Sequence, residues 1–232
     1  MHKSLLSAAA LALAVVAPLA HAHTEGDIIV RAGAITVNPK ADSSSVKVDQ
    51  GPLAGTDLHG KATMSSDTQL GLNFAYMITD HVGIELLAAT PFEHDVKLKG
   101  TALSAANGKL GSLKHLPPTL SVVYYPLDSK SVFQPYVGAG INYTWIYDEH
   151  VSSDAQAKGF SNFKASNSWG MAFQVGADYM ITDNIMLNAQ MRYIDIDTRA
   201  TVENDAVAPG TRARVNVDVD PFIYMVGLGY KF

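Results

Sequence analysis

Long runs in which bulky apolar residues alternate with small or polar ones constrain this chain most. In TQLGLNFAYMI, one face carries Leu70, Leu72, Phe74, Tyr76 and Ile78, while Gln, Gly, Asn, Ala and Met share the other. PYVGAGINYTWIY, SWGMAFQVGADYMI and the terminal PFIYMVGLGYKF repeat the pattern. Such alternation indicates β-strands, and these runs reach the roughly 9 to 11 residues that a tilted strand needs to cross a bilayer.

Weaker alternation at 27–37, 82–92, 116–125 and 185–195 brings the expected strands to eight. Tight turns rich in Asp, Asn, Thr and Ser join some of them, and long polar links at 40–64, 95–114, 149–165 and 199–212 join the others. Short turns at one end and long loops at the other are typical of outer-membrane barrels. We therefore expect an all-β, closed, eight-stranded antiparallel barrel in the outer membrane of a Gram-negative bacterium, with both termini in the periplasm.

The bulky face is expected to point outward into lipid, because the interior of an eight-stranded barrel is only just wide enough for side chains. Aromatic residues then form two girdles at the membrane boundaries. One would contain Tyr76, Tyr179, Tyr224 and Tyr230, and the other Trp145, Tyr147 and Trp169. A soluble, lipocalin-like barrel with its bulky residues inside is the alternative.

The first 22 residues have the features of a signal peptide. Lys3 precedes a short apolar run, and Ala20-His21-Ala22 supplies the small residues that cleavage requires. Residues 23–232 would then form a single barrel domain. The chain has no cysteine, so backbone pairing and packing must hold it together. Its formal net charge of −5 gives no reason to expect nucleic acid as a partner.

Several blocks in order, among them GDIIVRAGAITVNP, KHLPPTL, RYIDIDT and VDPFIYMVGLGYKF, are similar to the outer membrane protein W family. The residues of these blocks are most similar to the OprG branch of the family, and the resemblance covers the whole mature chain. It implies a barrel with an apolar channel for small hydrophobic molecules, which leave sideways through a break in the wall. For the OprG branch it also implies small amino acids as possible solutes.

Pro91 in AATPF is the sharpest local departure from the strand pattern. Proline lacks a ladder donor, so it predicts either a gap in the barrel wall or a harmless bulge where the strand leaves the bilayer. Pro117 and Pro118 would widen a gap if they lie opposite. With the family resemblance, we expect a lateral opening here.

Charged residues also fall on the inward face, mostly near the short-turn end. They are Asp27, Arg31, Glu85, Asp178, Arg192 and Lys231. Opposite signs should pair across the lumen, because buried charges need partners. The cluster would either close the periplasmic end or simply fill a narrow barrel. The apolar lumen above it is expected to contain Leu87, Ala89, Met77, Ile223 and Met225.

Histidines at 23, 59, 81, 94, 115 and 150 show no short metal-ligand spacing, so neither a metal site nor a cofactor is predicted, and several should be solvated in loops. SSDAQAKGF at 152–160 predicts a short helix over the mouth. The chain is not expected to be an enzyme. A lipid-acting barrel enzyme, the alternative, would combine His94 or His115 with Ser121 or Asp95.

These features predict a monomeric outer-membrane channel for passive diffusion of small, mainly hydrophobic solutes, which leave sideways near Pro91. Its partners would be the solute and outer-membrane lipid. Two alternatives stay open: a channel for small amino acids or other small polar solutes, and a structural or adhesive barrel without transport.

Overall fold

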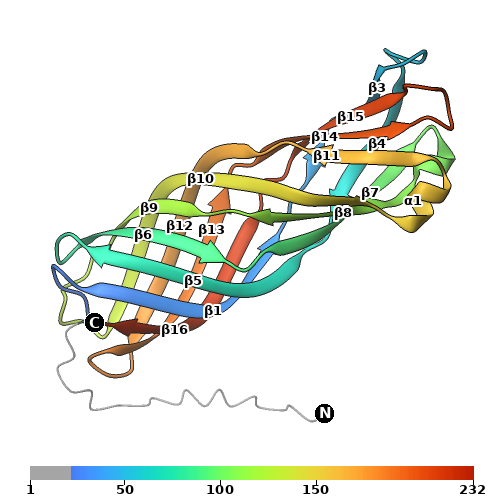
Figure 1. The fold of residues 1–232 in the computed structure, drawn as a ribbon. Helices are drawn as coiled ribbons and strands as arrows, with labels where there is room; N and C mark the ends of the chain where they lie inside the picture. The colour runs from blue at the N-terminus through green and yellow to red at the C-terminus, as the bar shows by residue number, and fades with distance from the viewer. Residues whose placement is uncertain (1–21) are drawn as a thin grey trace, which may run out of the picture.

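The structure, a computed structural model, describes residues 22–232 and consists almost entirely of antiparallel strands (Figure 1). Eight strands form a closed ring, in the order β1 (Ile28–Asn38), β5 (Asp67–Met77), β6 (Val82–Ala89), β9 (Thr119–Tyr124), β10 (Phe133–Val151), β12 (Ser168–Met180), β13 (Ile185–Ile194) and β16 (Phe222–Lys231). β16 pairs back with β1, so the ring closes and the expected barrel is confirmed. The predicted signal peptide, apart from Ala22, lies outside the described residues.

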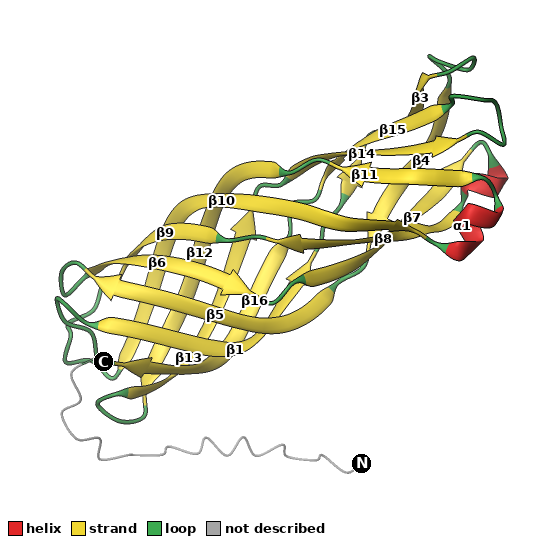
Figure 2. Cartoon of the chain, viewed as in Figure 1, coloured by secondary structure: helices red, strands yellow, loops and turns green. Residues whose placement is uncertain are grey.

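The links expected to be long polar loops fold instead into further strands, which extend the barrel beyond one end (Figures 1 and 2). This extension contains β2 (Asp42–Ser43), β3 (Val46–Gln50), β4 (Asp57–Met64), β7 (Phe92–Thr101), β8 (Gly108–Leu116), β11 (Phe160–Ala165), β14 (Asp197–Asn204) and β15 (Arg212–Asp218). Alternation explains them: Val46, Val96, Leu98 and Val215 are buried inside, while the polar set faces water. The prediction that these links are loops is therefore wrong.

Two short helical segments lie at the tip of the extension. They are a 3₁₀ turn, η1 (Ser104–Ala106), and helix α1 (Ser153–Ala157). Ser152 caps α1, because its side chain accepts a hydrogen bond from the Ala155 backbone N–H at 3.3 Å. The short helix expected at 152–160 is thus present. Among residues 22–232, no helix has the length and apolar character needed to cross a bilayer.

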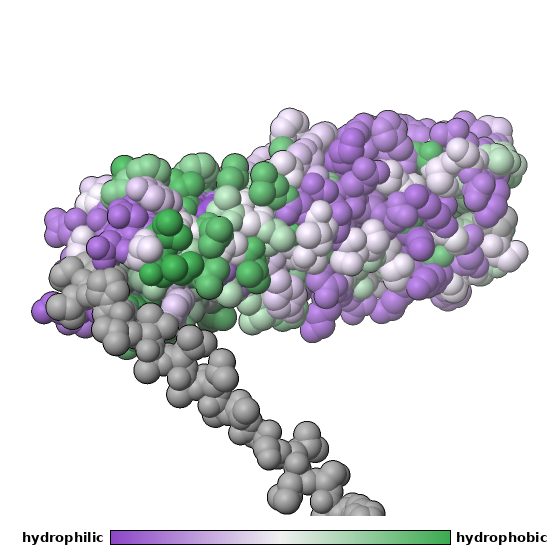
Figure 3. Space-filling model, turned by 90° about the horizontal axis from the view of Figure 1, so that it is seen from below, coloured by the Kyte–Doolittle hydropathy of each residue, from purple (hydrophilic) through white to green (hydrophobic). Residues whose placement is uncertain are grey.

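The bulky face of the barrel points outward. Phe74, Val137, Phe173 and Val226 are 44%, 52%, 52% and 63% exposed, while their strand neighbours point into the lumen. Figure 3 shows apolar side chains gathered over the barrel and polar ones over the extension, on the face that it draws. This apolar belt rules out the lipocalin-like alternative, in which the same residues would fill the interior.

Aromatic rings gather at the two ends of this belt. Near the extension, Trp145 lies 4.9 Å from Tyr147 between ring centroids, and Trp169 lies 4.6 Å from Tyr143. Tyr76, Tyr179 and Tyr230 lie at the end with the tight turns, as expected. Tyr224 does not join them, because it pairs with Thr36 and Met191 further along the barrel. Tyr224 and Tyr230 are six residues apart on one strand, which is about 20 Å. The predicted place of Tyr224 in that girdle is wrong.

Glycines opposite large inward side chains make room in the narrow lumen. Tyr136 is in register with Gly176, where a Cβ atom would lie 2.5 Å from the tyrosine Cζ. Arg31 is in register with Gly229, where a Cβ atom would lie 3.0 Å from the arginine Cγ. A side chain at either glycine would therefore displace the large side chain opposite it.

Candidate functional site

The lumen at the short-turn half of the barrel is filled by a buried polar cluster centred on Arg31 and Asp178. Arg31 Nε donates to Asp178 Oδ1 at 3.0 Å, and Arg31 Nη2 to Asp178 Oδ2 at 2.5 Å. His23 Nε2 lies 2.9 Å from Asp178 Oδ2. Asn73 and Tyr125 accept further hydrogen bonds from the guanidinium at 3.1 and 2.9 Å. Both charges are thus paired and hydrogen-bonded, as burial requires.

A second ion pair continues the cluster toward the extension. Arg192 Nη2 donates to Glu85 Oε1 at 2.6 Å and also to Gln174 Oε1. Gln174 Nε2 in turn donates to Glu85 Oε1 at 2.9 Å. Glu85 Oε2 lies 3.5 Å from Arg31 Nη1, which connects the two pairs across the lumen. We call this connected set the charged plug; it consists of His23, Arg31, Asn73, Glu85, Tyr125, Gln174, Asp178 and Arg192.

The remaining two charges lie at the rim. Lys231 Nζ is 3.7 Å from Asp27 Oδ2. All six residues predicted to form a lumen cluster therefore line the lumen and pair with opposite charges; that the cluster closes the barrel stays a prediction. Sequence reasoning missed four further members, His23, Tyr125, Gln174 and Asn188. Alternation places Gln174 on the inward face, and it also places Tyr125 there, at the end of the run 116–125.

Above the plug the lumen is apolar. Leu87, Ile223 and Met225 are buried in one apolar cluster with Phe92 and Val96. Ile223 is in register with Arg192 and Met225 with Gln190, so these two lie beside the second ion pair rather than above it. Met77 belongs elsewhere: it packs in the separate cluster at the short-turn end with Ile29 and Tyr125, because β5 runs downward from Gly71 to Met77. Met77 therefore lies below the plug, and its predicted place is wrong.

A row of three small apolar cavities runs through the extension. The innermost holds about 40 Å³ and is lined mainly by apolar residues, with His94, His115, Thr144 and Thr198 as polar members. It shares Phe163 and Ala200 with a cavity of about 20 Å³, which shares Val46 and Leu98 with one of about 50 Å³ at the mouth. Side chains nearly fill the extension, so a larger solute must displace them. We call the innermost cavity the apolar chamber.

The barrel wall is interrupted beside this chamber. The ladder between β6 and β9 ends at the pair Leu87–Thr119, and the ladder between β7 and β8 begins at Phe92–His115. In the described ladders, residues 88–91 and 116–118 are not paired with each other. The break in strand pairing expected at Pro91 is thus present, with Pro117 and Pro118 opposite; that it serves as a lateral opening stays a prediction. A cavity of about 240 Å³ lies there, lined by Ala88, Ala89, Leu116, Pro117, Pro118, Tyr143 and Trp145.

Asn142 on β10 supports one edge of this wall gap. Its Nδ2 donates to the Pro117 and Pro118 carbonyls at 3.0 and 3.1 Å and to Thr119 Oγ1 at 3.0 Å. The Pro118 carbonyl keeps a backbone donor, the Tyr143 N–H at 3.1 Å. The Pro117 carbonyl has side-chain donors instead, Asn142 Nδ2 from inside the barrel and Thr119 Oγ1 at 3.1 Å. Alternation placed this residue inward, but only the ladder register shows that it faces the prolines.

Two of the histidines, His94 and His115, are buried together. His94 and His115, 0% and 6% exposed, lie with Nε2 atoms 2.8 Å apart, and Phe92 stacks on His115 with ring centroids 5.3 Å apart. Ser121 is on β9, in register with Glu85 and Gly140. Asp95 pairs with Lys109 at 2.7 Å. Among the described residues, neither Ser121 nor Asp95 is hydrogen-bonded to His94 or His115, so the set named in the enzyme alternative is not assembled there.

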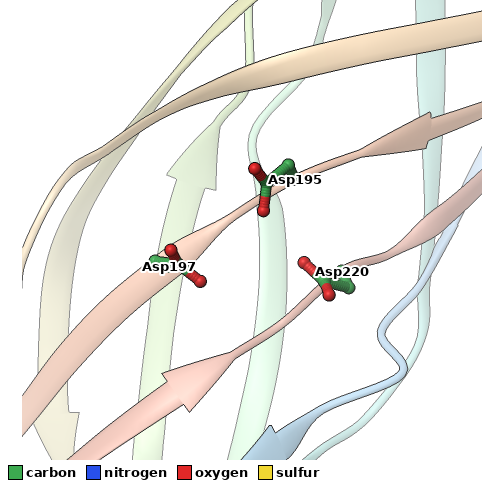
Figure 4. A group of neighbouring side chains, drawn as sticks. All are labelled: Asp195, Asp197 and Asp220. Atoms are coloured by element: carbon green, nitrogen blue, oxygen red, sulfur yellow. The ribbon is translucent and has the colours of Figure 1, made fainter.

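Three exposed or half-buried carboxylates form the group best able to hold a metal ion in the part of the chain that the structure describes. Asp195, Asp197 and Asp220 place oxygen atoms within 4.8 Å of one another (Figure 4). They lie where β13 continues into β14 and β15 into β16. Partial desolvation, and then repulsion from Asp195 and Asp218, raise the pKa of Asp197.

A closed barrel with an apolar belt, aromatic girdles and short turns at the end where Phe232 pairs with Ile28 defines an outer-membrane β-barrel protein. A profile of the OmpW family matches residues 24–232, and the chain belongs to this family. Because such barrels keep their short turns in the periplasm, the extension faces the exterior.

Relatives and solved structures agree with this assignment. The chain is 42% identical to outer membrane protein W of Vibrio cholerae over 232 residues, all of both chains. It is 39% identical to outer membrane protein W of Escherichia coli over 228 residues, 98% of this chain and 99% of that one. The crystal structure of OprG from Pseudomonas aeruginosa superimposes with a TM-score of 0.83 at 46% identity, covering 92% of this chain and 99% of OprG.

Proposed function

We propose that this protein is a channel for passive diffusion of small, mainly hydrophobic solutes across the outer membrane, with exit through the wall gap. One observation carries the proposal: the order of the features along the barrel axis. The apolar cavities come first from the exterior, the wall gap opens beside the innermost of them, and the charged plug fills the lumen beyond.

This order favours a sideways route for an apolar solute. Passage straight through would require it to separate buried ion pairs, and breaking such a pair costs about 3–5 kcal/mol. Passage through the gap separates no ion pair and leads into the acyl chains of the membrane. Transfer into the acyl chains lowers the free energy of an apolar solute, because its surface leaves water.

The proposal is tested with the refolded mature protein in liposomes that contain lipopolysaccharide, whose sugar layer slows the entry of apolar solutes. Influx of toluene and of glycine is measured in parallel. Protein-dependent influx of toluene alone supports the proposal. Influx of glycine would show a wet path past the plug. Influx of neither would favour the structural or adhesive alternative.

The second candidate, a channel for small amino acids, has one specific observation in its favour. Arg192 is 2% exposed, and its Nε and Nη1 atoms have no hydrogen-bond partner among the described residues. Guanidinium donors are suited to a carboxylate. A zwitterion that reached the plug would find them, so the glycine arm of the experiment also tests this candidate.

A further inference from the structure

The His94–His115 pair lies between the apolar chamber and the wall gap. Both side chains line the chamber. Along the chain, His94 is three residues after Pro91, and His115 is two residues before Pro117. Phe92, fully buried directly after Pro91, stacks on His115. The pair therefore lies in the chamber wall on the side of the wall gap, whose lining includes the next residue, Leu116.

The hydrogen bonds fix which nitrogen of each ring carries a proton. His94 Nδ1 lies 2.5 Å from the Ser65 carbonyl oxygen, which can only accept, so Nδ1 carries the proton. Burial lowers the pKa of both imidazoles, that of His115 to about 3, so both are neutral near pH 7. His94 Nε2 is then an acceptor, and the proton between the rings belongs to His115 Nε2.

This assignment leaves His115 Nδ1 as a bare lone pair. The atom is buried and has no hydrogen-bond partner within residues 22–232. The hydroxyl groups of the other polar chamber residues already donate elsewhere: Thr144 Oγ1 to Asn142 Oδ1 and Thr198 Oγ1 to the Ser166 carbonyl, both at 2.7 Å. A ligand that satisfies His115 must therefore bring its own donor.

From this geometry we propose that His115 Nδ1 is a binding subsite for the hydroxyl group of an amphiphilic solute, such as a medium-chain alcohol or a phenol, on its way from the chamber to the wall gap. This inference rests on the proposed hydrophobic channel and names a preferred solute class. The chamber volume of about 40 Å³ exceeds the roughly 10–15 Å³ that one water needs, so a hydroxyl group fits. Carboxylates, which only accept, are disfavoured.

A direct test needs no transport. The protein, labelled with ¹⁵N-histidine in lipid nanodiscs, is titrated with 1-octanol and separately with octane. We expect one ring protonated at Nδ1 and one at Nε2, and an upfield shift of the bare Nδ1 signal of His115 with octanol only. The same shift with octane, no shift with octanol, or a proton already on His115 Nδ1 would overturn the subsite.

The variant for the transport test must remove both acceptors, because replacing His115 alone would leave His94 Nε2 without a partner. His94→Phe with His115→Phe keeps two flat rings beside Phe92 and removes every imidazole nitrogen there. His150→Phe is the matched control, since His150 is exposed and bonded to Asp148. Folding of each variant is checked by the shift in gel mobility on heating.

In the lipopolysaccharide liposomes, the ratio of octanol to octane influx should fall about fivefold in the double variant, the factor that one neutral hydrogen bond supplies. His150→Phe should leave the ratio unchanged. An equal ratio in wild type and double variant would overturn the subsite while octane influx upholds the channel. Absence of octane influx in wild type would instead overturn the channel, and the titration then decides the subsite by itself.

Discussion

Arg31 and Asp178 form a two-point ion pair at the centre of the lumen, with Nε–Oδ1 and Nη2–Oδ2 distances of 3.0 and 2.5 Å. Both side chains are completely buried. Replacing one partner leaves a charge that water cannot reach, which costs about 3–5 kcal/mol. We therefore expect Asp178→Asn to lower the free energy of unfolding by that amount, measured by urea unfolding in lipid vesicles.

Asp27→Asn is the matched control for that change. It makes the same carboxylate-to-amide replacement in the partly exposed rim pair with Lys231, whose atoms are 3.7 Å apart. Such pairs contribute about 0–1 kcal/mol. Equal effects of the two substitutions would show that burial of the Arg31–Asp178 pair has no energetic consequence.

Removal of the second ion pair should open the lumen to ions. Glu85 and Arg192 meet across the barrel at 2.6 Å. We expect Glu85→Ala with Arg192→Ala to raise the single-channel conductance in planar bilayers several-fold, because two large side chains leave and no net charge is created. Asp27→Ala with Lys231→Ala at the rim should change it little. An unchanged conductance in the first variant would place the constriction in the apolar layer above.

The sequence predicted the barrel well because the lipid outside its wall and the narrow lumen inside each restrict which residues the strands can carry. Outward residues such as Phe173 must suit lipid, and inward ones such as Gly176 must fit a narrow lumen, so bulky and small residues alternate. The extension has water outside and a packed interior, so its inward residues, such as Val96 and Leu98, are the apolar ones. Charged outward residues there resemble those of a loop.

The site was harder to predict, because it depends on register between strands that are distant in sequence. The two-residue alternation of side chains along each strand is enough to place the charged residues inside the barrel. Their pairing follows from the need to neutralise buried charge. The His94–His115 contact requires Phe92, not His94, to lie opposite His115, so that the two histidines are diagonal neighbours. The register of these two strands cannot be derived from a single sequence.

Restored pairing at the wall gap should slow apolar entry. Pro91 has no N–H group, and the ladders on either side stop at Leu87 and resume at Phe92. We expect Pro91→Val to reduce toluene influx into liposomes several-fold, because valine has a backbone N–H donor and strongly favours strand conformation. Pro209→Val, at an exposed turn of the extension, is the control. Unchanged influx through a folded Pro91→Val protein would exclude the sideways route.

The histidine pair should make stability depend on pH. Burial lowers the pKa of both His94 and His115, the latter to about 3, whereas an unfolded histidine titrates near pH 6.5. Below about pH 6.5 the unfolded chain therefore binds more protons than the folded one, and stability falls as the pH falls. The stabilising contribution is complete above pH 6.5.

The window from pH 6.5 to 5 isolates this effect, because most carboxylates remain ionised there. We expect the wild type to lose up to about 1.4 kcal/mol of unfolding free energy per pH unit for each histidine, and His94→Phe with His115→Phe to lose much less. Urea unfolding in vesicles at several pH values measures both slopes. Parallel slopes would mean that the pair takes up protons in the folded barrel, contrary to the burial and hydrogen bonding that keep both rings neutral.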